Sequence, residues 1–143
     1  FVKGSPSKEL QKMHEAVLKA QEQGIKSIIP GRKARDIHKI CADILLQAGY
    51  DVGDEDVSAL STGQAGGRQG FVHSTGHGVG LEVHEEPRLG EKSEAILAPG
   101  NIVTIEPGLY YSQLGGVRIE DDILVTEQGS ENLTSYPKNF IIP

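Results

Sequence analysis

The chain has 143 residues, a formal net charge of −6 and 37% hydrophobic residues, which fits one globular domain of ordinary composition. Its mild acidity argues against a nucleic-acid partner or an anionic membrane surface. The apolar runs are too short for a transmembrane helix, and no charged-then-apolar signal segment opens the chain. The single cysteine, Cys41, lies in an apolar helical pattern, so we expect a buried core thiol and a cytoplasmic protein.

The first third of the chain predicts two amphipathic helices. An N-cap at Ser5 precedes apolar residues that recur at helical spacing to about Ile28. A second apolar stripe predicts a helix from near Ala34 to Gly49, and glycine is a common residue just past a helix end. The histidines on these helices are expected at the surface: His14 and His38.

The remainder of the chain predicts strands after a loop. The segment from Asp51 to Gly70 is rich in Asp, Ser, Gly and Gln and predicts an exposed loop. Short β-branched runs separated by turn residues then predict four strands. These are Asn101 to Glu106, Leu109 to Ser112, Val117 to Glu120 and Ile123 to Thr126. Helices followed by antiparallel hairpins define an α+β fold.

Histidine and glycine alternate between residues 73 and 85. The glycines make a helix costly here, so we expect an extended segment in which His73 and His77 share a face. A lone histidine in a strand is usually structural. Three within one glycine-rich segment, His84 included, favour a functional site.

Two glutamates follow apolar runs. Glu106 ends one predicted strand and Glu120 another, and a buried carboxylate is costly unless it is paired or binds a metal. The alternative is that Glu106 caps a strand at the surface and that residues 120–122 form a solvated charge run. Together with the histidines, the glutamates instead form an oxygen-rich ligand set of the kind that suits manganese(II). A serine hydrolase is not favoured, because the chain has no Gly-x-Ser-x-Gly motif.

Three motifs resemble the pita-bread metallopeptidases, the family of Xaa-Pro aminopeptidases, prolidases and methionine aminopeptidases. They are His73–Glu85, Pro99–Gly108 and Gly116–Asp121, and they occur in family order. The resemblance covers nearly the whole chain except the loop from about Asp54 to Gly70. It implies an α+β, incomplete pita-bread fold with two amphipathic helices on a curved antiparallel sheet. Residues 1–143 would then be the carboxyl-terminal part of a single metallopeptidase catalytic domain, with the amino-terminal portion absent.

The resemblance also implies a metal centre. The intact enzyme would hold two divalent ions, with manganese(II) expected and cobalt(II) or zinc(II) as alternatives. His77, Glu106 and Glu120 look like three of the five ligands, with Glu120 bridging both ions and Glu106 acting as general base. The other two ligands in the family are aspartates on an upstream hairpin. No aspartate of this chain lies in a matching motif, so we expect the chain by itself to be inactive.

Three further residues match catalytic positions of the family. His84 looks like the histidine that contacts substrate and helps a proton reach the leaving amine, and His73 looks like a second active-site histidine. Arg118 resembles the arginine of the proline-specific branch. The implied function is cleavage of the Xaa-Pro bond by a metal-activated water, on peptides with proline second, by a homodimer. A non-catalytic peptide- or protein-binding module that keeps this fold is the alternative.

Overall fold

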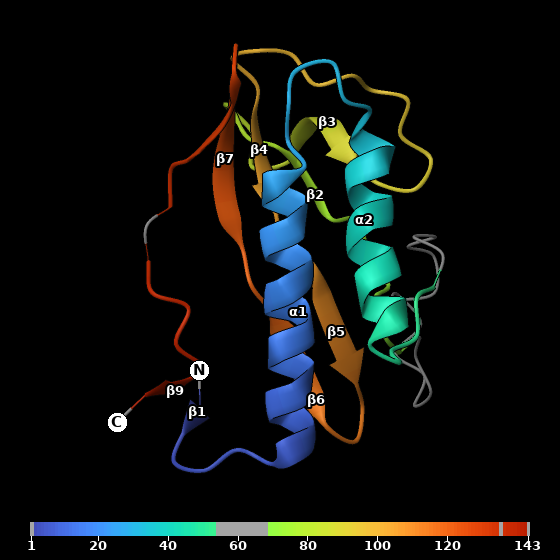
Figure 1. Ribbon diagram of the computed structural model, residues 1–143, viewed down its shortest axis with the longest axis vertical. Coiled ribbons are helices and arrows are strands. Elements are labelled where there is room, and N and C mark those ends of the chain that lie inside the picture. Colours follow the sequence, from blue (N-terminus) through green and yellow to red (C-terminus); the bar gives the residue numbers. More distant parts are fainter. Residues whose placement is uncertain (1, 54–68, 135, 143) are drawn as a thin grey trace.

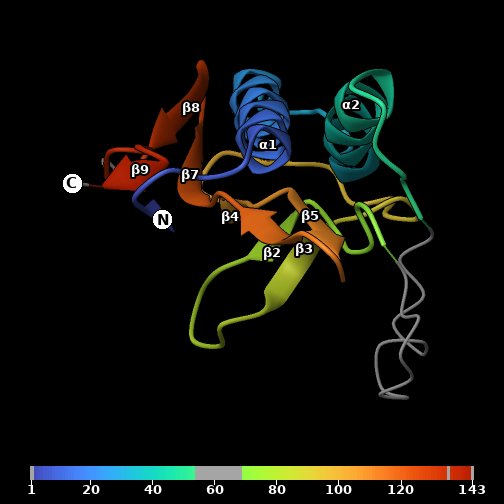
Figure 2. The same ribbon diagram turned by 90° about the horizontal axis from the view of Figure 1, so that it is seen from below.

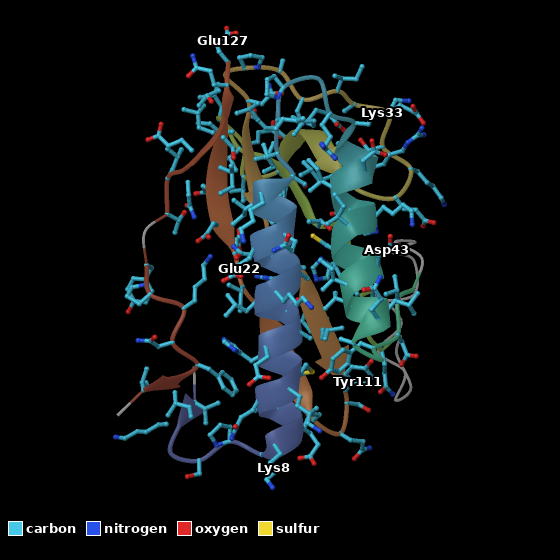
Figure 3. The ribbon with its side chains drawn as sticks, in the orientation of Figure 1. Lys8, Glu22, Lys33, Asp43, Tyr111 and Glu127 are labelled. Carbon is cyan, nitrogen blue, oxygen red and sulfur yellow. The ribbon has the colours of Figure 1, made fainter. Side chains whose placement is uncertain are left out.

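The computed structural model describes residues 2–53, 69–134 and 136–142. Two helices, α1 (Lys8–Lys26) and α2 (Ala34–Gln47), lie side by side on one face of a sheet (Figures 1 and 2). Lys8 and Lys33, which mark the starts of the two helices, lie at opposite ends of the pair, so the helices run antiparallel (Figure 3). In the described part of the chain, neither helix is long and apolar enough to cross a membrane.

The main sheet has five antiparallel strands in the order β3-β2-β4-β7-β8. Their bounds are β2 (Gly76–Gly78), β3 (Glu85–Leu89), β4 (Ile102–Ile105), β7 (Asp121–Thr126) and β8 (Gly129–Asn132). Two smaller ladders complete the fold: β5 (Gly108–Tyr111) pairs with β6 (Gly115–Arg118), and β1 (Val2–Lys3) pairs in parallel with β9 (Ile141–Ile142). This arrangement confirms the predicted α+β class.

The helix ends follow the sequence signals closely, with one correction. The hydroxyl of Ser7, rather than Ser5, caps α1 by accepting the N–H of Leu10 at 3.1 Å. Gly49 follows α2 with a φ of +87°, a conformation that glycine adopts without strain, as predicted.

The predicted extended segment from 73 to 85 is wrong in its length. It divides into the short strand β2, a turn at residues 79–84, and the start of β3, which the alternation pattern did not predict. β2 is short and made of Gly-His-Gly because it lies between two close neighbours. A Cβ at Gly76 would overlap the Thr104 carbonyl, and one at Gly78 would overlap the Glu86 carbonyl. The predicted loop from Asp51 to Gly70 lies mainly outside the described residues.

The helices pack on the sheet through small residues. A Cβ at Gly24 of α1 would lie only 2.7 Å from the Sγ atom of Cys41 and 3.2 Å from Ile105 of β4. The Cys41 thiol is fully buried, donates to the Ala20 carbonyl at 3.4 Å, and has its pKa raised to about 12 by burial. The prediction of a core thiol is confirmed.

The surface prediction for His38 is wrong. This residue is buried on the inner face of α2, where its Nδ1 lies 3.1 Å from the Thr75 hydroxyl and its ring stacks on Phe71. Burial lowers the pKa of His38 to about 4. His14 is half-buried and stacks on Phe140, and burial likewise lowers its pKa.

Candidate active site

A groove of about 470 Å³ lies beside the turn at residues 79–84. The turn extends from the sheet on the face opposite the helices (Figure 2). The groove brings together most of the residues that the sequence predicted. Its polar lining includes His77 from β2, His84 from the turn, Glu106 after β4, Arg118 at the end of β6, and Glu120 between β6 and β7.

His77 is buried and held in one orientation. Its Nδ1 lies 2.9 Å from the carbonyl oxygen of Gly78, and a carbonyl can only accept, so Nδ1 carries a proton. Nε2 is then the ring nitrogen left to share a proton with a neighbouring acceptor or to bind a cation, which is the arrangement that metal-binding histidines commonly have. Nε2 points to Glu106, with a distance of 3.1 Å to Oε1.

Glu106 is mostly buried, with 14% of its side chain exposed. The hydroxyl of Thr104 donates to Glu106 Oε1 at 3.0 Å and accepts the backbone N–H of His77 at 3.0 Å. Thr104 therefore fixes the strand that carries His77 and the carboxylate opposite it. The surface-cap alternative for Glu106 is wrong.

Arg118 lies close to the carboxylates of both Glu106 and Glu120. The Nε atom of Arg118 lies 3.6 Å from Glu106 and 3.9 Å from Glu120. Burial, and then the nearby charge of Glu106, raise the pKa of Glu120. The two carboxylates thus share one arginine, and the repulsion between them would be reduced by an added cation.

The donor set fits a divalent ion only in part. Among the described residues, no three histidine, cysteine, aspartate or glutamate side chains converge closely enough to form a complete metal site. One imidazole nitrogen and two carboxylates are nevertheless chemically suited to manganese(II) or a similar ion. That His77, Glu106 and Glu120 bind a metal stays a prediction.

The remaining histidines occupy different places. The His84 ring is exposed and meets the His77 ring edge-on, with centroids 4.4 Å apart. His73 lies outside the groove lining, with its Nε2 3.1 Å from the Tyr110 hydroxyl. His73 precedes β2 and is not in a strand, so the face-sharing predicted for His73 and His77 does not apply.

Sequence reasoning missed two residues of the site. Tyr110 contacts His73, and its hydrogen bond with Arg118 raises the arginine pKa. Thr104 lies two residues before Glu106, and that spacing in a strand could have marked it as a neighbour on the same face. Asp121 was read, in the alternative above, as part of a solvated charge run. It is buried, so that part of the alternative is wrong.

The chain belongs to metallopeptidase family M24, whose family model matches residues 1–127. It is 42% identical over 139 residues to an uncharacterised peptidase, YqhT, of Bacillus subtilis, covering 97% of this chain and 35% of the relative. It is 39% identical over 141 residues to the Xaa-Pro dipeptidase of Pyrococcus furiosus, covering 99% and 36%. The chain thus spans about a third of the length of these relatives.

The fold comparison agrees. The structure of an Xaa-Pro dipeptidase from Bacillus anthracis superposes with a TM-score of 0.84 at 40% identity, covering 99% of this chain and 36% of that one. The resemblance to pita-bread metallopeptidases is therefore confirmed at the level of family and fold. The domain boundaries and the individual roles of the site residues stay predictions.

Proposed function

We propose that this chain contributes to a metal-dependent peptidase that cleaves the bond between an amino-terminal residue and proline. One observation carries the proposal: Glu106 meets His77, Thr104 and Arg118 at once, in a groove beside Glu120. A binding module would have no need of two carboxylates at one groove, one of them mostly buried, because burying a carboxylate is costly unless it is paired or binds a cation. The Xaa-Pro dipeptidases among the relatives support the choice of substrate.

The ligands we propose from this chain are His77 Nε2, Glu106 and Glu120. Two divalent ions, manganese(II) being our choice, would also need ligands from outside the chain. When bound, such ions polarise the scissile carbonyl and lower the pKa of a water molecule.

The residues of the groove then divide the remaining work. Glu106 accepts a proton as general base; Thr104 donates to its Oε1, and its Oε2 lies 3.6 Å from the Nε atom of Arg118. His84, exposed at the rim, donates a proton to the leaving proline nitrogen. Arg118 balances the charge of the two carboxylates and is itself hydrogen-bonded to Tyr110. The homodimer and the cytoplasmic location stay predictions.

The test is peptide hydrolysis by the full-length gene product with manganese(II). We expect an Xaa-Pro dipeptide to be cleaved at least about tenfold faster than its Xaa-Ala analogue. We also expect activity to disappear on chelation and to return with manganese(II). Equal turnover of the two peptides, or activity that survives exhaustive chelation, would refute the proposal. A protein with neither hydrolysis nor bound metal would instead support the non-catalytic alternative.

A further inference from the structure

The turn at residues 79–84 is closed from inside by the carboxylate of the residue that follows it. Glu85 Oε1 accepts the backbone N–H of Glu82 at 2.8 Å. The N–H of Gly80 completes the turn with a longer bond of 3.3 Å to the Glu82 carbonyl. The side chain of Glu85 thus reaches back across the turn instead of extending into solvent.

Gly80 provides the space for this carboxylate. A Cβ at position 80 would lie 2.7 Å from Glu85 Oε1 and 2.6 Å from the carboxyl carbon, closer than real Cβ contacts. The backbone of Gly80 and the carboxylate of Glu85 are therefore in direct contact. A side chain at one position requires movement at the other.

Beyond the N–H of Val79, which donates to the Ile102 carbonyl of β4 at 3.0 Å where the turn begins, the turn has few contacts with the body of the protein. Leu81 is fully exposed and Val83 is 74% exposed, so the apolar side chains of the turn do not anchor it to the body of the protein. His84, directly before Glu85, meets His77 only edge-on across the groove. Because His84 and Glu85 are adjacent, a carboxylate that fixes the turn also fixes the backbone from which His84 projects.

We propose that Glu85 is a positioning residue that holds His84 over the groove. The inference rests on the proposed function, in which His84 handles a proton. Glu85 itself touches neither metal nor reacting atoms. Its hydrogen bond limits the turn to the conformation in which the His84 ring meets His77, and misplacement of a catalytic group by about 1 Å can cost on the order of 100-fold in rate.

The first test is a double-mutant cycle on the full-length gene product with an Xaa-Pro substrate. We expect Glu85→Ala to lower kcat by about 10- to 100-fold with the metal content unchanged, and Glu85→Gln, which keeps the acceptor oxygen, to retain most activity. In a His84→Ala background, Glu85→Ala should cost nothing further. The same loss in both backgrounds would show that Glu85 does not act through His84.

The second arm uses Gly80. Gly80→Ala should impair kcat in the wild type, where the carboxylate is in the way, and should add nothing to Glu85→Ala. Equal costs in both backgrounds would overturn the proposed contact. Glu86→Ala is the matched control, because its carboxylate accepts the N–H of Arg88 outside the turn, and it should leave kcat unchanged.

A readout without turnover separates this inference from the proposed function. Amide hydrogen exchange of the peptide covering residues 79–85 should be faster in Glu85→Ala than in Glu85→Gln or Glu86→Ala. Unchanged exchange would overturn the proposal even in an active enzyme. If Glu85→Ala exchanges faster but the wild type cleaves no Xaa-Pro peptide, the proposed function is refuted while the tie between Glu85 and the turn stands.

Discussion

Lys138 forms an ion pair with Asp121, the residue that follows Glu120 in the sequence. The Lys138 ammonium donates to Oδ2 of Asp121, whose side chain is 1% exposed, and also to Gln21 Oε1 at 2.8 Å. The same Asp121 oxygen accepts amide N–H groups from Gln21 and Asn132, each at 2.9 Å. The cluster joins α1, β7, β8 and the segment before β9 at the point where β7 begins.

Removal of the lysine should be costly. In Lys138→Met the buried Asp121 carboxylate loses its cation, and we expect the free energy of unfolding to fall by about 3 kcal/mol. The double variant Lys138→Met with Asp121→Asn should recover part of the loss, because the uncompensated charge is gone. Urea unfolding of the full-length gene product measures both. The exposed Lys19→Met is the control, and an equal effect there would rule out this account.

Close packing between the helices gives a second prediction. Gly24→Ala places a methyl group against Cys41 Sγ, and we expect a loss of about 2 kcal/mol in unfolding free energy. Cys41→Ala in the same chain should remove most of that penalty, since the sulfur is the nearest atom. The exposed Glu22→Ala on the same helix is the control (Figure 3). Penalties that simply add in the Gly24 and Cys41 double variant would contradict the contact.

The pKa of His38 predicts a dependence of stability on pH. The unfolded chain binds a proton on this residue below pH 6.5, whereas the folded chain does so only near pH 4. Acid therefore favours unfolding, and the His38 contribution should cost about 3 kcal/mol between pH 6.5 and pH 4. His38→Asn removes this titration. The wild type should thus lose more unfolding free energy than the variant over this range, and parallel curves would show that His38 is not the cause.

Substitution of Glu120 should remove the metal, whereas substitution of His84 should impair only proton transfer. Glu120→Ala should abolish both metal content and activity in the full-length gene product, because the proposed site loses a carboxylate. His84→Ala should lower turnover by about 10²–10⁴-fold while the metal stays bound. Metal analysis together with kcat distinguishes them, with the exposed Glu127→Ala as control. Loss of metal in His84→Ala would show that its role is assigned wrongly.

The sequence predicted features that depend on neighbouring residues, and it missed features that depend on contacts between distant segments. Local signals located both helices, because apolar spacing and the glycine at position 49 act within one turn. The burial of His38 was not predictable this way, since it depends on Thr75 and Phe71 from a distant segment. β3 was missed because only its last residue, Leu89, is buried and the four before it show no apolar alternation.

In the candidate site, likewise, some residues were predictable from the sequence and others were not. Residues inside the motifs, such as His77 and Glu106, were named correctly as neighbours because the motifs gather residues around one groove. Tyr110 was missed because its hydroxyl group has no distinctive pattern in a strand, whereas the spacing of Thr104 to Glu106 could have indicated a shared face. The pair of Asp121 and Lys138 was invisible for another reason: in sequence, a charge run next to Glu120 looks the same whether it is solvated or buried.

The last prediction concerns residues 1–143 expressed by themselves. The groove offers one imidazole and two carboxylates, and Arg118 already offsets part of the negative charge. These donors can hold at most one divalent ion weakly, since a second ion would add two positive charges with no further ligands to balance them. We therefore expect substoichiometric manganese(II) binding, weakened further by Glu120→Ala, and no Xaa-Pro hydrolysis. Metal analysis after gel filtration, with a dipeptide assay on the same sample, makes the measurement. Two tightly bound ions with activity equal to that of the full-length gene product would show that this chain carries a complete site.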